Sequence, residues 1–285
     1  MLDLWGIASI TSKFMLYLGL LTSVGTVYSA MLFQLTDYRR FAFVFATLGI
    51  VATLLNFLLV GASLTGDASG MLDWEILSLL WVTPIGTTLV LRVIGLGLLI
   101  FGIFLKRVGL VIAVFGGTCA LWSFANVGHI LDRDSLGLSF ILMLHLVSIS
   151  IWIGVLSPLR RLSLDMTRLS DAAYLGRRFG DIATMFVPLL ILAGGYMSYV
   201  FAGSVSALLD SRYGQFLIIK VFLVVLLMGL AATNKLRFIP LMEAGDKNSS
   251  NRLAKSISFE WTIVIVILFI TAILTSVLTL PATGF

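Results

Sequence analysis

The chain has 285 residues, of which 59% are hydrophobic and 12% are charged, and its mean hydropathy is +1.08. A soluble globular protein has about 25% charged residues, so this composition excludes water as the main solvent of the chain. The formal net charge of +5 is explained mostly by where the basic residues lie, and little of it is left to indicate nucleic-acid binding.

The apolar residues form blocks of about twenty, which is the length that crosses ~30 Å of hydrocarbon as a helix. Backbone polar groups in lipid must be satisfied within the chain, so these blocks are predicted to be helices. The segment 71–81 is too short to span and is predicted to be an interfacial helix. We therefore predict an all-α membrane bundle with spans near residues 13–35, 41–63, 84–105, 108–131, 136–158, 183–203, 214–234 and 259–280.

Lysine and arginine gather in alternate connections, namely those after the first, third, fifth and seventh spans. The positive-inside rule places these connections in the cytoplasm. Both termini are then expected on the outer, periplasmic side, and the connections at 159–182 and 235–258 are expected to be basic cytoplasmic loops. We divide the chain into an N-terminal hairpin with its outer loop, residues 1–80, and a six-helix region, residues 81–285.

The sequence has no phosphate-binding glycine loop and no Cys-x-x-Cys motif, and its one cysteine, Cys119, excludes an intramolecular disulfide. An ATP-driven pump needs a nucleotide-binding element such as the phosphate-binding glycine loop, so we do not expect this chain alone to be such a pump. We expect no enzymatic activity, and we expect the function to reside in the helix bundle.

Two histidines are the first candidates for chemistry. His129 lies at the outer end of the fourth predicted span and His145 lies inside the fifth. Ionisable groups within a membrane are costly and mark functional sites by default, although a buried imidazole that only bridges two helices is the alternative. In an antiparallel hairpin the two histidines are offset by ~12 Å along the axis, so they predict two stations on a path rather than one site.

Soft ligands accompany the deeper histidine. Cys119 on the fourth span and Met197 on the sixth are expected near the depth of His145, and Asp132 follows His129 at the surface. Thiolate, thioether and imidazole together favour Cu(I). The alternatives are that the methionine is apolar filling and that the buried cysteine is inert.

Three cations, Lys13, Arg92 and Lys220, lie in or near spans and away from the cytoplasmic clusters. They are expected to snorkel outward, to pair with acids, or to bind an anionic headgroup or a cofactor carboxylate. No acid lies near the middle of a predicted span, and Glu260, at the cytoplasmic start of the last span, is the nearest.

Several segments resemble the copper-resistance protein D (CopD) family. The segment 144–159, LHLVSISIWIGVLSPL, resembles that family's His followed by Trp-x-Gly, and Gly128-His129 resembles a Gly-His element before it. The segment 213–242 resembles the family's seventh helix, and Glu260 with Leu280-Pro281 resembles its last. The resemblance runs from about residue 80 to 281 and matches the family at His129, His145, Trp152, Lys220 and Asn234.

The resemblance implies a bacterial inner-membrane protein of copper uptake or resistance, with copper ion, membrane lipid and a periplasmic copper-binding protein as partners. Three hypotheses follow. The first is a copper permease that uses the outer station and the deeper His/Cys/Met site. The second is a haem-binding electron-transfer protein, because the family is grouped with b-type cytochromes. The third is an accessory membrane subunit that docks a periplasmic copper carrier.

Overall fold

The computed structural model describes residues 4–106, 108–126, 136–202 and 209–276, and within these ranges the chain is helical with no strand. Eight helices are long and apolar enough to cross a membrane, which confirms the predicted all-α bundle. They are α1 (Leu4–Phe33), α2 (Arg39–Thr65), α4 (Pro84–Phe104), α5 (Gly109–Trp122) with the 3-10 turn that extends it to Asn126, α6 (Leu136–Leu164), α7 (Leu169–Ala202), α9 (Arg212–Thr233) and α11 (Lys247–Ser276).

Short elements complete the described chain. The short helix predicted in the segment 71–81 is present as α3 (Trp74–Trp81), and the carboxylate of Asp73 caps it by accepting the backbone N–H of Glu75 at 2.9 Å. The remaining short elements are η1 (Ala68–Met71), η2 (Ser123–Asn126), which continues α5, and η4 (Asn234–Phe238) and α10 (Ile239–Glu243), which continue α9. The turn η4 is π-helical.

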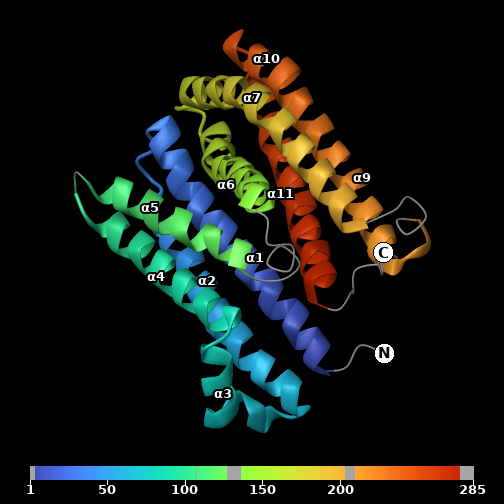
Figure 1. Cartoon of the computed structure of the whole chain (residues 1–285). Helices are drawn as coiled ribbons and strands as arrows, with labels where there is room; N and C mark the ends of the chain where they lie inside the picture. The colour runs from blue at the N-terminus through green and yellow to red at the C-terminus, as the bar shows by residue number, and fades with distance from the viewer. Residues whose placement is uncertain (1–3, 107, 127–135, 203–208, 277–285) are drawn as a thin grey trace.

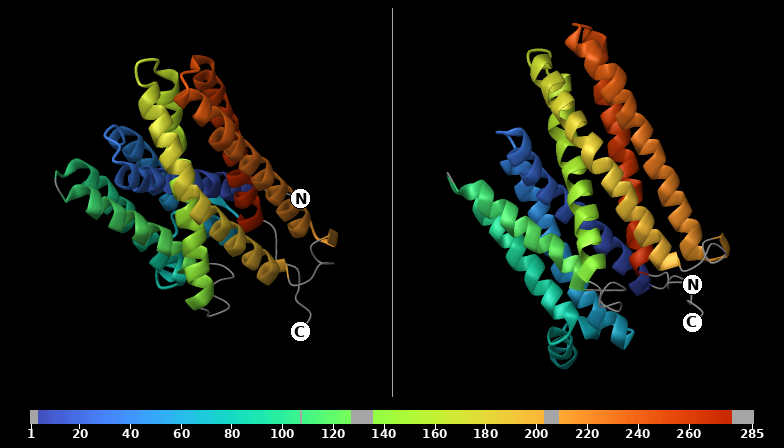
Figure 2. Two further views of the ribbon diagram at one scale, coloured as in Figure 1. Left: turned by 90° about the horizontal axis from the view of Figure 1, so that it is seen from above. Right: turned by 45° about the horizontal axis from the view of Figure 1, so that its top comes forward.

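Helix α1 is the central helix of the bundle. The most apolar stretch of α1 is 78% buried, and the helix contacts α2, α5, α6 and α11. The pair α4 and α5 lies on one side of α1, and α7, α9 and α11 lie on the other (Figure 1, Figure 2). The fully buried side chains of Leu20, Val24 and Val27 place the core along α1.

Two glycines bring α1 and α6 into backbone contact. A Cβ on Gly25 would lie 1.8 Å from the carbonyl oxygen of Ser150, and a Cβ on Gly154 would lie 2.0 Å from the carbonyl oxygen of Gly25. No side chain fits at such distances, so glycine is required at both positions. Small residues at helix contacts are the usual way that membrane helices gain packing energy without a hydrophobic driving force.

Helices α7 and α11 begin well before the apolar blocks that predicted them. The sequence predicts spans at 183–203 and 259–280 with polar loops before them, whereas α7 begins at Leu169 and α11 at Lys247. The predicted loops 159–182 and 235–258 are therefore mostly helix, and the connections shorten to residues 165–168 and 244–246. A hydropathy pattern marks only the apolar part of a helix, and the polar turns beyond it contribute no signal.

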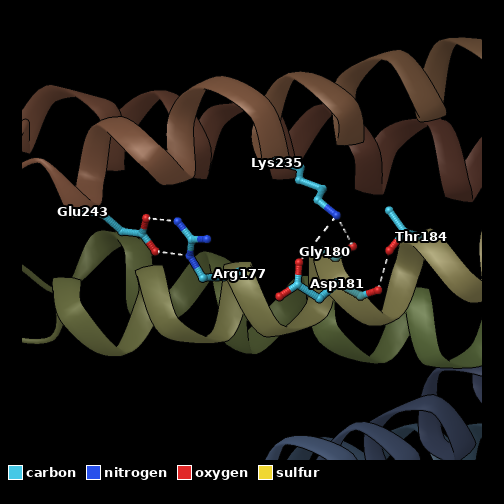
Figure 3. Close-up of polar contacts among 6 residues, drawn as sticks. All are labelled: Arg177, Gly180, Asp181, Thr184, Lys235 and Glu243. Carbon is cyan, nitrogen blue, oxygen red and sulfur yellow. Dashed lines mark hydrogen bonds and ion pairs between the residues drawn. The ribbon is translucent and has the colours of Figure 1, made fainter.

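Ion pairs join these polar turns. The guanidinium of Arg177 on α7 binds both carboxylate oxygens of Glu243 on α10. The ammonium of Lys235 donates to the carbonyl oxygen of Gly180 at 2.7 Å and lies 3.6 Å from the carboxylate of Asp181 (Figure 3). These ion pairs and the connections 34–38, 165–168 and 244–246 lie at one end of the bundle, which we call the basic end. The opposite end, where α1 begins and α11 finishes, is the N-terminal end.

Candidate metal site

His145 lies on α6 and faces α7 at Gly194. A Cβ added to Gly194 would lie 3.3 Å from Cε1 and 3.7 Å from Nδ1 of the imidazole, so the glycine makes room for the ring. The backbone of Leu190, one turn earlier on α7, interacts with the imidazole, and Lys220 on α9 is close enough to interact electrostatically. The imidazole thus lies between α6, which carries it, and α7, with the charge of Lys220 on α9 within electrostatic range.

The Nδ1 atom of His145 is buried and has no hydrogen-bond partner among the described residues. Buried polar side-chain atoms are nearly always hydrogen-bonded, and each exception needs an explanation. An imidazole nitrogen with a free lone pair is also a metal ligand. The imidazole therefore interacts with the backbone of Leu190 and still has one buried nitrogen without a described partner, which makes His145 a candidate ligand.

Met197 lies on the same helix interface as His145. It is 8% exposed and packs in a small cluster with Leu138, Ile141 and Leu142 of α6. On α7 it follows Gly194 by three residues, which is one helical turn, so the thioether and the imidazole lie on one face of that helix. The imidazole of His145 and the thioether of Met197 thus both lie at the contact of α6 with α7.

Cys119 lies on another interface. It is half-buried on α5, and its electrostatic neighbour is Tyr28 of α1. The hydroxyl of Tyr28 forms a hydrogen bond of 2.8 Å with that of Thr118, the residue before the cysteine. Cys119 therefore belongs to the contact of α1 with α5, whereas His145 belongs to the contact of α6 with α7.

The predicted outer station, His129 with Asp132, lies outside the described residues. Within the described ranges, no three histidine, cysteine or acidic side chains form a cluster that could hold a metal ion. A site at His145 would therefore use few protein ligands, and the sulfur of Met197 at the same helix contact is a soft candidate.

A second buried polar group lies further toward the basic end. The carboxylate of Glu260, which is 2% exposed, accepts a hydrogen bond of 3.1 Å from Nε1 of Trp152 and another from the side-chain amide of Asn234. The edge-to-face rings of Phe179 and Phe186 surround the indole. Asn234 is the first residue of the π-helical turn η4, a feature found frequently at functional sites.

The sequence indicates Trp152, Asn234 and Glu260 one by one, but it does not predict that they contact each other. It placed Glu260 at the start of the last apolar span, and because α11 begins earlier, at Lys247, the residue lies near the middle of the helix. It also does not predict that Gly194 lies against His145. The pair Gly194-Gly195 inside an apolar helix is the one signal, and it does not say which residue the glycine contacts. Contacts between side chains on distant helices leave no local pattern in the sequence.

The fold and these groups define a multi-pass helical membrane protein with a mostly apolar core that contains a few buried polar side chains. Two family models match the chain: copper resistance protein D-like, N-terminal domain, over residues 1–140, and copper resistance protein D over residues 173–274. Together they cover most of the sequence, and the chain belongs to the copper resistance protein D family. Comparisons with curated proteins and with solved structures give no significant match.

Membership of this family confirms the resemblance stated from the sequence and makes the chain a copper-resistance membrane protein. The matched ranges include Cys119 and His129 in the N-terminal model and Met197, Lys220, Asn234 and Glu260 in the other. His145 and Trp152 lie in the interval 141–172 between the two matches.

Proposed function

We propose that the protein moves copper ions across the bacterial inner membrane and that His145 is a ligand of its deeper copper site. The observation that carries the proposal is the buried, unpartnered Nδ1 of His145 between α6 and α7. Family membership supplies the metal, and the side chain supplies a nitrogen ligand that no described residue satisfies.

Met197 is the second ligand we propose. It shares the α6–α7 interface with His145, and a thioether with an imidazole favours Cu(I) over the harder divalent ions. A site with few ligands suits a cargo ion, because an ion that must leave again cannot be bound by a complete cage. Cys119, which lies next to Tyr28 of α1, would then serve only if the ion also passes between α1 and α5.

In this proposal the outer station is His129 with Asp132, which would receive copper from a periplasmic copper-binding protein. The orientation follows from the basic residues of the basic end, which the positive-inside rule places in the cytoplasm. Copper would enter at the N-terminal end, reach His145, and leave toward the basic end. The copper ion is the substrate of this process, and no chemical step on it is required.

The test compares His145→Ala and Met197→Leu with the wild type for copper accumulation in cells at equal expression. Met185→Leu is the matched control, because Met185 lies on the same helix but is 76% exposed. We expect His145→Ala to abolish copper-dependent accumulation, Met197→Leu to reduce it, and Met185→Leu to leave it unchanged. Normal accumulation in His145→Ala would overturn the proposal.

Metal analysis and an optical spectrum of the purified protein distinguish a copper permease from the two alternatives, a haem-binding electron-transfer protein and an accessory docking subunit. Bound copper that is lost in His145→Ala, without a Soret band, supports the permease. A Soret band would instead assign the protein to haem-based electron transfer. Copper binding that requires an added periplasmic copper protein would indicate an accessory, docking subunit.

A further inference from the structure

Two basic side chains lie in one region near the N-terminal end of the bundle. Lys13 comes from α1 and Arg92 from α4, and the two are close enough for their charges to repel each other. An arginine in a protein is always charged. Like charges that approach within a mostly apolar bundle require a compensating group, and the neighbours of each cation show whether the protein supplies it.

Arg92 is 7% exposed, and its described partners are neutral. Its Nε donates to the hydroxyl of Ser123 at 2.9 Å, and its guanidinium carbon lies 4.6 Å from the centre of the Phe124 ring. Both partners belong to η2. They hold the guanidinium in one orientation, but the aromatic face and the hydroxyl do not neutralise its charge.

Lys13 and Tyr17 are anchored to the same residue of α11. The ammonium of Lys13 donates to the main-chain carbonyl of Thr275, and the hydroxyls of Tyr17 and Thr275 form a hydrogen bond of 2.9 Å. The ring of Tyr17 also lies 5.6 Å from that of Phe124. Phe124 therefore contacts both Arg92 and Tyr17, so the six residues form one continuous cluster.

The cluster has no described acid. The carboxylates that form ion pairs within the described ranges bind Arg161, Arg168, Arg177 and Lys235, and all four of these lie at the basic end. A buried charge without a partner is strongly unfavourable, and the cost is removed when an opposite charge with matching hydrogen bonds is bound. Two fixed cations and a tyrosine hydroxyl are complementary to an oxyanion.

We infer that Lys13, Tyr17 and Arg92 form a binding site for a phosphate group. Guanidinium and ammonium donors are the side chains that most often bind phosphate in proteins. The site lies at a suitable depth for lipid, because Ser123 and Phe124 belong to the last turn of the span ending at Asn126, and Thr275 to the last turn of the span ending at Ser276. The phosphate belongs to the headgroup of an anionic phospholipid or to a free phosphate ion.

The experiment measures thermal unfolding of the full chain, purified in detergent and stripped of lipid. Phosphatidylglycerol, phosphatidylcholine and inorganic phosphate are added in separate titrations to the wild type, Arg92→Gln and Lys13→Gln. Arg237→Gln is the matched control, since it also removes one positive charge but from an exposed side chain. No copper is present, so the result is independent of the proposed transport.

We expect phosphatidylglycerol to raise the unfolding temperature of the wild type and of Arg237→Gln. In Arg92→Gln and Lys13→Gln the lipid should bind about tenfold more weakly, which is the effect of losing one charged hydrogen bond. If inorganic phosphate alone gives the shift and the lipid does not, the same site binds a free ion.

Equal stabilisation of the wild type and both cluster variants by phosphatidylglycerol would overturn the proposal. Equal stabilisation by phosphatidylglycerol and phosphatidylcholine in all proteins would also overturn it, because that result means general solvation by lipid. If Arg92→Gln does not fold, Lys13→Gln and Tyr17→Phe carry the test, because they leave the buried guanidinium and its contacts with η2 in place.

Discussion

The indole Nε1 of Trp152 donates a hydrogen bond of 3.1 Å to a carboxylate oxygen of Glu260, although the residues are separated by 108 positions. The amide of Asn234 donates to the other oxygen of the same carboxylate. One acid therefore joins α6, η4 and α11 in the part of the bundle between the candidate copper site and the basic end.

Removing this acid should destabilise the bundle. Glu260→Ala leaves two buried donors without an acceptor, and each such donor costs about 1–3 kcal/mol, with values toward the lower end in membrane proteins. Glu260→Gln keeps one carbonyl acceptor, so one of the two donors stays unpaired, and it should lower the unfolding temperature by about half as much. Thermal unfolding of the detergent-purified variants measures both changes.

Glu243→Gln is the control for this prediction, because Glu243 pairs with Arg177 on the surface at the basic end. Surface ion pairs contribute about 0–1 kcal/mol, so its effect should be small. If Glu260→Ala is no less stable than Glu243→Gln, the carboxylate of Glu260 is not the structural acceptor that its two contacts indicate.

The close contact of α1 with α6 gives a second prediction. Gly154→Ala places a methyl group 2.0 Å from the carbonyl oxygen of Gly25, so the two helices must separate. Overpacking of this kind costs about 1–3 kcal/mol. Gly229→Ala is the matched control, because no atom lies within 4 Å of a Cβ at that position on α9.

We expect Gly154→Ala to lower the unfolding temperature and Gly229→Ala to leave it unchanged or raise it, since alanine is favoured over glycine within a helix by up to about 1 kcal/mol. A Gly154→Ala protein as stable as Gly229→Ala would show that α1 and α6 are further apart than the structure places them.

The sequence was sufficient for the fold because the dominant signal is local. Eight apolar blocks predict eight spans, and the short apolar segment 71–81 predicts one further helix. The structure contains all eight, and α3 lies within that segment. The predicted lengths of α7 and α11 were too short, because polar helical turns stabilised by distant partners such as Arg177 and Glu243 have no hydropathy signal. The division at residue 80 stays a prediction.

The site was only partly predictable. Single residues such as His145 and Glu260 stand out because ionisable groups are rare in an apolar sequence. Their partners do not stand out. Gly194 contacts His145, and Asn234 contacts Glu260, only because of how the helices are placed against each other, and the sequence gives no local sign of that placement. The depth estimate that grouped Cys119 with His145 gives the level along the membrane but not the helix face, and Cys119 lies next to Tyr28 of α1.

The orientation of the bundle is a third prediction. The basic end carries the Arg177–Glu243 and Lys235–Asp181 pairs and most of the basic residues, and the positive-inside rule places it in the cytoplasm. Alkaline phosphatase fused after Phe285 should be active, and the same enzyme inserted at Gly245 should be inactive. A cytoplasmic fluorescent reporter at the two positions should give the opposite result, and the reverse pattern in both reporters would invert the proposed direction of copper entry.

The last prediction concerns the space that Gly194 leaves beside the imidazole of His145, and it tests the copper site without changing a ligand. Gly194→Ala adds a methyl group 3.3 Å from Cε1 of His145, so the imidazole must move by a few tenths of an ångström or more. Gly195→Ala is the control on the same helix, because nothing lies within 4 Å of a Cβ there. If His145 binds copper on the α7 side, Gly194→Ala should weaken Cu(I) binding by about tenfold, equivalent to about 1.4 kcal/mol, while Gly195→Ala binds like the wild type. Competition with a chromogenic Cu(I) chelator measures both affinities. Unchanged affinity in Gly194→Ala would place the bound ion on the opposite edge of the imidazole, away from Met197, and would remove the thioether from the site.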